Sequence, residues 1–156
     1  LRFGMEKFVA YCAQSGVDGL IVADLPYEEG EEFETLCREH GVSLIYLLAP
    51  HLDPNRTAGI LQSSSGFVYV VAQYSTTGVA QQSRQITEET IASLHAQTDL
   101  PIYLGFGISS TERAAELSSK ADGVIIGRWL IKELEAADFA PKRAGEFVRQ
   151  VKQALE

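Results

Sequence analysis

The sequence predicts an α/β fold with an all-parallel sheet, because short apolar runs alternate with longer amphipathic segments along the whole chain. Five runs rich in Val, Ile and Leu are the candidate strands: residues 20–23, 44–49, 67–72, 102–106 and 124–126. Each run is continuously apolar, which is typical of strands buried on both faces of a parallel sheet. The doubly wound sheet and the (β/α)8 barrel both use this alternation, so the runs alone leave both architectures open.

Helical signals fill the segments between these runs. The first segment has an apolar stripe with helical spacing, formed by Met5, Phe8, Val9 and Cys12. Asp53 followed by Pro54 is typical of a helix N-terminus. Gly41 stands where a left-handed residue commonly ends a helix, and Pro141 opens the last helical pattern. No repeat or linker interrupts the alternation, so we expect a single domain over residues 1–156.

The composition narrows the classes of partner. The chain has 13 Lys and Arg against 21 Asp and Glu, a net charge of −8, which argues against nucleic acid as a partner. No apolar run approaches the ~20 residues that a membrane span needs, so we expect no membrane partner. Cys12 and Cys37 lack metal-ligand spacing. We therefore expect two buried thiols, no metal site and a cytoplasmic protein.

Glycine-containing turns follow the last two apolar runs. Gly105 and Gly107 stand at the end of one run, Gly127 ends the other, and each turn precedes a helical segment. Ser109 has capping-box spacing to Glu112. Glycine lets backbone N–H groups approach an anion, and a helix N-terminus attracts negative charge. One such turn is compatible with tight-turn geometry alone, but two on successive strands favour the phosphate site that many barrels build there.

Several segments together resemble the tryptophan synthase alpha subunit family. Residues 16–29 read GVDGLIVADLPYEE and are similar to that family's fourth-strand segment. Residues 48–50 (LAP) and 65–69 (SGFVY) resemble the end of its fifth strand and the start of its sixth. Residues 98–101 (TDLP) with 105–109 (GFGIS), and residues 121–127 (ADGVIIG), resemble its seventh and eighth strands. The resemblance runs in order over essentially the whole chain.

The resemblance implies a TIM barrel of the (β/α)8 type, with this chain as an incomplete barrel of about five parallel strands and flanking helices. It implies retro-aldol cleavage of indole-3-glycerol phosphate to indole and glyceraldehyde 3-phosphate in tryptophan biosynthesis. The alpha subunit would need no cofactor of its own, because pyridoxal phosphate is expected in a beta-subunit partner. In the family, both catalytic carboxylates lie on the first strands. The five strands expected here resemble the last five of the family's eight. We therefore assign no catalytic residue in this chain and expect it to be inactive alone.

The resemblance also implies roles for particular residues. The substrate-binding residues would be Ile21, Leu47, Tyr69 and Thr77, of which the first three line the indole pocket. The phosphate-binding residues would be Gly78, Gly105, Gly107, Gly127 and Arg128. Asp24 would lie at a strand mouth near the partner interface, although its residue type also fits a structural carboxylate or a general base.

The chain departs from the family pattern at two places. Residues 72–78 read AQYSTTG where the family has a loop of the type S-x-x-G-V-T-G, and Arg128 stands where the family usually has Ser. Arg128 can bind phosphate through two hydrogen bonds, or it can lie along the surface. These departures keep an alternative open, namely a non-catalytic half-barrel that binds phosphate or a partner and that self-associates through its exposed edges. A phosphate-binding barrel with another small substrate is a third, weaker alternative.

Overall fold

The computed structural model describes residues 3–49, 53–71, 73–74, 84–105 and 107–155. Each of the five apolar runs contains parallel strand. The strands are β1 (Gly19–Ile21), β2 (Ser43–Ile45), β3 (Leu47–Leu48), β4 (Val68–Val71), β7 (Ile102–Gly105) and β8 (Gly123–Ile125). The second run is divided into β2 and β3, which are separated only by Tyr46. Ala72 and Phe106, which end two of the expected runs, lie outside the described residues.

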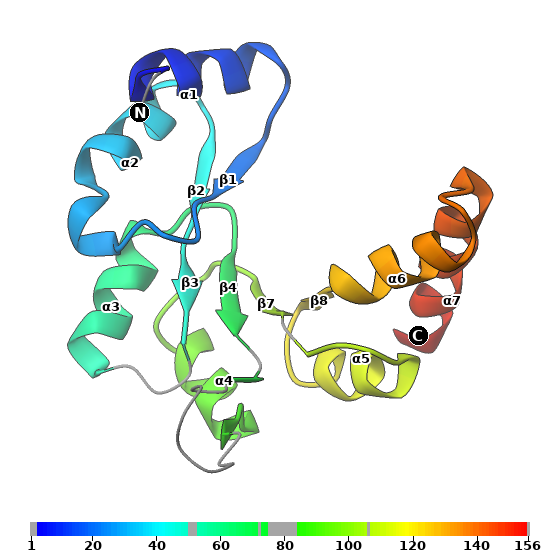
Figure 1. The fold of residues 1–156 in the computed structure, drawn as a ribbon. Coiled ribbons are helices and arrows are strands. Elements are labelled where there is room, and N and C mark those ends of the chain that lie inside the picture. Colours follow the sequence, from blue (N-terminus) through cyan, green and yellow to red (C-terminus); the bar gives the residue numbers. More distant parts are fainter. Residues whose placement is uncertain (1–2, 50–52, 72, 75–83, 106, 156) are drawn as a thin grey trace, which may run out of the picture.

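The sheet is parallel, as the sequence predicts. β1 pairs with β2, and the remaining strands form a sheet in the order β3-β4-β7-β8. Because β2 and β3 are consecutive pieces of one segment, the strand order follows the chain order from β1 to β8. In-order parallel strands joined by helices are the arrangement of a (β/α)8 barrel, so the doubly wound alternative is excluded and the incomplete barrel is confirmed. Figure 1 shows the first helix near β1 and β2 and the last helix beyond β8, at the other end of the strand order.

Helices connect the strands and carry the expected end signals. They are α1 (Met5–Gln14), the short 3-10 turn η1 (Tyr27–Glu29), α2 (Glu31–Glu39), α3 (Pro54–Ser63), α4 (Glu88–His95), α5 (Thr111–Ser118), α6 (Arg128–Ala136) and α7 (Pro141–Leu155). Asp53 caps α3, because its Oδ1 accepts hydrogen bonds from the backbone N–H groups of Asn55 and Arg56. Gly41 follows α2 with a φ of 69°, in the left-handed region that glycine favours.

The two faces of the sheet differ in burial. Along β4, Val68 and Val70 are buried against the helices, whereas Tyr69 and Val71 are only half-buried on the other face. The core on the helix side also includes Leu48, Ile102, Leu104, Ile91 and Leu117. The expectation of strands buried on both faces was therefore wrong for β4, whereas it holds for β2, where the successive residues Leu44 and Ile45 are both buried. The reason for the half-buried face of β4 is that the described strands come from only five apolar runs, whereas a closed barrel fills its interior with side chains from eight strands.

A short antiparallel hairpin follows β4 and was not expected from the sequence. β5 (Gln73–Tyr74) pairs with β6 (Arg84–Gln85), and residues 75–83 lie between them, outside the described residues. Thr77 and Gly78, two of the proposed site residues, fall in that stretch. None of the described helices is long and apolar enough to cross a membrane.

Candidate functional site

An open cavity of about 740 Å³ lies where β4, β7 and β8 end. Its lining residues are Tyr69, Gly107, Ile108, Ser109, Ile125, Gly127, Arg128, Trp129 and Lys132. The carboxyl ends of parallel strands are where barrels build their ligand sites, from the loops that follow each strand. Four of the residues assigned from the sequence, Tyr69, Gly107, Gly127 and Arg128, therefore share one cavity.

The turn before α5 places a serine in this cavity. Gly107 has a φ of 75°, a left-handed conformation that side chains rarely adopt. The N-cap of α5 is Ser110, whose Oγ accepts a hydrogen bond from the backbone N–H of Arg113 at 3.2 Å. The capping spacing assigned to Ser109 was therefore wrong by one residue. Because Ser110 caps the helix, the exposed Ser109 is left to line the cavity.

The turn before α6 leaves room for a ligand. Gly127 is the N-cap of α6 and, lacking a side chain, caps none of its N–H groups. A Cβ built at Gly127 would meet no heavy atom within 4 Å, so packing within the chain does not require glycine there. The space beside Gly127 is the cavity itself. A helix N-terminus without a side-chain cap presents free N–H donors and a positive partial charge, which suit an anion.

Packing against α7 fixes which face of α6 lines the cavity. Trp129 packs edge-to-face on Phe147 of α7, with ring centroids 4.7 Å apart, and Glu133 forms an ion pair with Arg143 of α7. Arg128 and Lys132 are one helical turn apart and both line the cavity, so they bring two positive charges to the same wall. Sequence reasoning missed Lys132, Trp129 and Ser109. Lys132 could have been predicted from the sequence, because residues four positions apart, such as Arg128 and Lys132, lie on the same face of a helix.

Tyr69 and Gly105 are in close contact on the half-buried face. A Cβ built at Gly105 would lie 2.5 Å from Tyr69 Cε1, so the tyrosine ring occupies the space that a side chain at position 105 would need. Burial raises the pKa of the Tyr69 hydroxyl above its ordinary value, because burial disfavours the charged phenolate. Gly105 lies at the end of β7 but is not among the residues that line the large cavity.

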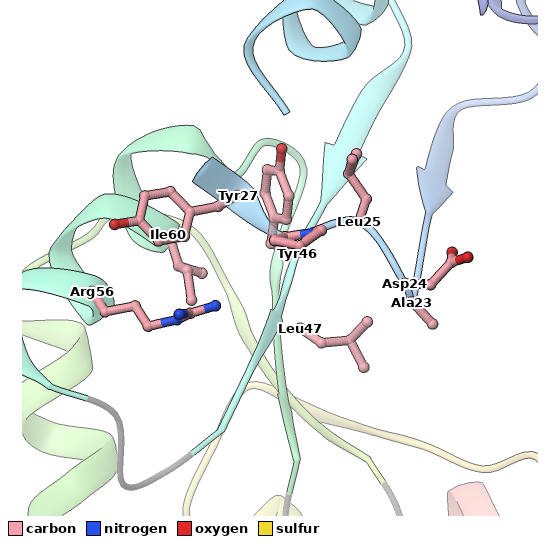
Figure 2. Close-up of a pocket in the computed structure, with 9 residues that line it drawn as sticks. Ala23, Asp24, Leu25, Tyr27, Tyr46, Leu47, Arg56 and Ile60 are labelled. Atoms are coloured by element: carbon pink, nitrogen blue, oxygen red, sulfur yellow. The ribbon is translucent and has the colours of Figure 1, made fainter. Parts of the chain in front are cut away.

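A second, smaller cavity of about 250 Å³ lies beside the segment that follows β1 (Figure 2). It is lined by Ala23, Asp24, Leu25, Pro26, Tyr27, Tyr46, Leu47, Arg56 and Ile60. Leu47 is the register partner of Tyr69 on the neighbouring strand, so the two proposed indole-pocket residues are adjacent. Ile21 is 46% exposed and lines neither of these two cavities. Asp24 is exposed at the end of β1.

Acidic residues are distributed unevenly around these cavities. None of the described residues that line the large cavity is an aspartate or glutamate, and Asp24 is the only acidic one among the described residues that line the smaller cavity. Within the described residues, no group of three or more His, Cys, Asp and Glu side chains is placed to hold a metal ion. The described lining of the large cavity therefore offers positive charge, backbone donors and an aromatic wall, and none of it is an acid–base pair.

The fold and the site define the class of protein as a (β/α)8-barrel protein with an open cavity at the carboxyl ends of its strands. The family model of the tryptophan synthase alpha chain matches residues 1–156. The chain therefore belongs to the tryptophan synthase alpha chain family, as the sequence motifs predict.

Individual relatives agree with this assignment. A tryptophan synthase alpha chain of Methanosarcina mazei is 38% identical over 155 residues, which are 99% of this chain and 56% of the relative. The crystal structure of tryptophan synthase from Mycobacterium tuberculosis matches with a TM-score of 0.82 and 28% identity, over 99% of this chain and 57% of that chain. The tryptophan synthase a2b2 complex of Pyrococcus furiosus matches with a TM-score of 0.77 and 31% identity, over 99% of this chain and 61% of that chain. This chain thus spans somewhat more than half the length of each.

Proposed function

We propose that this chain supplies the phosphate-binding and part of the indole-binding wall of a tryptophan synthase alpha-type lyase. The reaction would be retro-aldol cleavage of indole-3-glycerol phosphate to indole and glyceraldehyde 3-phosphate. The observation that carries this proposal is the cavity in which Gly127, Arg128 and Tyr69 meet. It combines an uncapped helix N-terminus and a positive charge with an aromatic side chain, which matches a substrate with a phosphate at one end and an indole at the other.

The geometry supports a division of roles along the cavity. The phosphate would bind at the N-termini of α5 and α6, through Gly107, Ser109 and Gly127 with Arg128. The indole ring would lie toward Tyr69 and its neighbour Leu47. Thr77 would contact the substrate and Gly78 its phosphate, although both lie outside the described residues. Gly105 would act through the Tyr69 ring that packs on it. Ile21 would extend the apolar wall on β1.

Cleavage needs an acid and a base. Retro-aldol release of indole requires a proton to be added to the ring carbon and another to be removed elsewhere. Because no described residue that lines the large cavity is acidic, we propose that this chain alone binds the substrate without cleaving it. The acid and base would come from residues outside the described cavity lining.

We also propose a beta-subunit partner that carries pyridoxal phosphate, whereas this chain would hold no cofactor. The matched Pyrococcus furiosus structure is that of an a2b2 complex. Asp24 lies exposed at the mouth of β1, where it is accessible to such a partner. Both thiols, Cys12 and Cys37, are free and buried, which fits a reducing, cytoplasmic environment.

Calorimetric titration of the chain with indole-3-glycerol phosphate and with unphosphorylated indole-3-glycerol tests the proposal. We expect heat of binding for the phosphate ester and at least about tenfold weaker binding without the phosphate. We expect no indole release from the chain alone. Equal affinity for both compounds would reject the phosphate site. Tight binding of inorganic phosphate or glycerol 3-phosphate without any contribution from the indole would favour a phosphate-binding module instead.

A further inference from the structure

The segment after β1 depends on its neighbours for its position. Residues 22–30 contain one strand-end turn, in which Leu25 N–H donates to Val22 O, and the short turn η1. Within η1, Glu29 N–H donates to Pro26 O and Gly30 N–H donates to Tyr27 O. Three backbone hydrogen bonds in short turns hold a segment only weakly, because each closes a loop of a few residues.

Helix α3 holds this segment through Arg56. The guanidinium Nη1 of Arg56 forms an ion pair with Glu28 Oε1 at 3.0 Å. The Cζ of Arg56 also lies 5.7 Å from the centroid of the Tyr27 ring, within range of a cation–π interaction. Figure 2 shows Arg56 reaching from α3 toward Tyr27 on one side of the smaller cavity, with Asp24 on the other side. One side chain thus contacts two successive residues of η1.

The backbone of α3 completes this contact at Gly59. A Cβ built at Gly59 would lie 2.5 Å from Tyr27 Cε2, so the tyrosine ring packs directly on the helix backbone. Tyr27 therefore contacts both Gly59 and Arg56. On the other side of η1, Tyr46 Oη donates a hydrogen bond to Glu34 Oε1 at 2.8 Å and lies under Gly30. Arg56 and Gly59 thus contact Tyr27 at the beginning of η1, and Tyr46 contacts Gly30 at its end.

We propose that Arg56 is a positioning residue that fixes the exposed Asp24–Pro26 turn by holding η1 on helix α3. Because α3 follows β3, the contact links the strand that carries Leu47 with the segment that carries Asp24, and both residues line the smaller cavity. The consequence for partner binding rests on the proposed function, in which this turn faces the beta subunit. The fixing of the turn itself is independent of that function.

Amide hydrogen exchange of the Arg56→Met variant tests the fixing of the turn. Methionine keeps the aliphatic stem and removes the charge, so both contacts of the guanidinium are lost. We expect the amides of Leu25, Glu29 and Gly30 to exchange about three- to tenfold faster. The amide of Thr57 inside α3 should be unchanged. Arg38→Met is the matched control, because it removes an exposed guanidinium whose hydrogen bond is to Thr35 of its own helix.

The outcome is decided by comparing these two variants. Equal exchange in Arg56→Met and Arg38→Met at the η1 amides would overturn the proposal. Faster exchange throughout α3 in Arg56→Met would also overturn it, because the effect would then be general destabilisation of the helix.

Measuring the affinity of the Arg56 variants for a tryptophan synthase beta chain tests whether Arg56 positions the turn for a partner or has only a structural role. We expect Arg56→Met to weaken binding about three- to tenfold, and Arg56→Lys to restore part of the loss by keeping the charge opposite Glu28. Equal beta-chain affinity of Arg56→Met and the unmodified chain would overturn the positioning role. If the unmodified chain binds no beta chain, the partner in the proposed function is rejected, while hydrogen exchange still decides whether Arg56 fixes the turn.

Discussion

The ring of Tyr69 on β4 covers the Cα of Gly105 on β7, two positions beyond its own register partner Tyr103. The contact explains why glycine stands at position 105 in a strand, where it is otherwise unfavourable. It also orients the aromatic wall of the large cavity. The glycine therefore acts on the site through a neighbouring side chain.

Gly105→Ala should destabilise the protein and displace Tyr69. The new methyl group would overlap the ring, and overpacking of this kind costs about 1–3 kcal/mol. Urea unfolding would measure the loss of stability. Indole-3-glycerol phosphate affinity should also fall, since the ring must move from its present position. Unchanged stability and affinity would show that the ring moves without cost, and would contradict the proposed role of this contact.

Gly127→Ala should weaken ligand binding without a matching loss of stability. A Cβ at this position meets no protein atom within 4 Å, so unfolding free energy should change by less than about 1 kcal/mol, the scale of an N-cap substitution. The methyl group would instead occupy the cavity beside the α6 N-terminus. We expect phosphate-ester affinity to fall about tenfold in calorimetry, as for the loss of one hydrogen bond to a charged group. Affinity equal to that of the unmodified chain would place the phosphate elsewhere.

Arg128→Met and Lys132→Met should each weaken binding of the phosphate ester. Both cations line one wall of the cavity, and a charged hydrogen bond to phosphate is stronger than a neutral one. We expect about a tenfold loss for Arg128→Met, a smaller loss for Lys132→Met, and a weaker dependence of affinity on salt in both. Arg149→Met on α7 serves as the control for net charge. The same loss in all three variants would point to general electrostatics.

Unfolding stability should decline with pH in the alkaline range because of Cys37. Burial, followed by the charges of Cys12 and Glu34, raises the pKa of the Cys37 thiol from 9.0 to about 11. Above about pH 9 the unfolded chain loses this proton while the folded chain keeps it, so stability is complete below pH 9 and falls toward pH 11. Urea unfolding across this range should show a smaller decline in Cys37→Ala.

Cys12→Ala is the control for the alkaline measurement. It removes a thiol but leaves the burial of Cys37, so most of the decline should persist. Tyr46, whose pKa is raised by burial and then by its hydrogen bond to Glu34, adds to the decline in every variant. Identical slopes in the unmodified chain and in Cys37→Ala would contradict the assignment.

Local chemistry determined much of this protein from sequence alone. Apolar runs placed the strands within one or two residues, because short runs rich in Val, Ile and Leu between turn signals favour strands. Asp53 and Gly41 marked helix ends because capping and left-handed backbone depend on residues next to each other in the chain. The family, too, was recognisable from strand-end motifs that stand in order along the sequence.

Only the tertiary structure decided which of these residues meet. Ser110 rather than Ser109 caps α5, a choice between neighbours of the same type that depends on how the turn approaches the helix. Two contacts join residues of different elements, namely Tyr69 with Gly105 and Arg56 with Tyr27. Lys132 lines the large cavity because of how α6 packs against α7. A sequence pattern reports the periodicity of one helix or strand. These contacts depend instead on the register between strands and on the rotation of each helix about its axis, which are set by the packing of the whole chain.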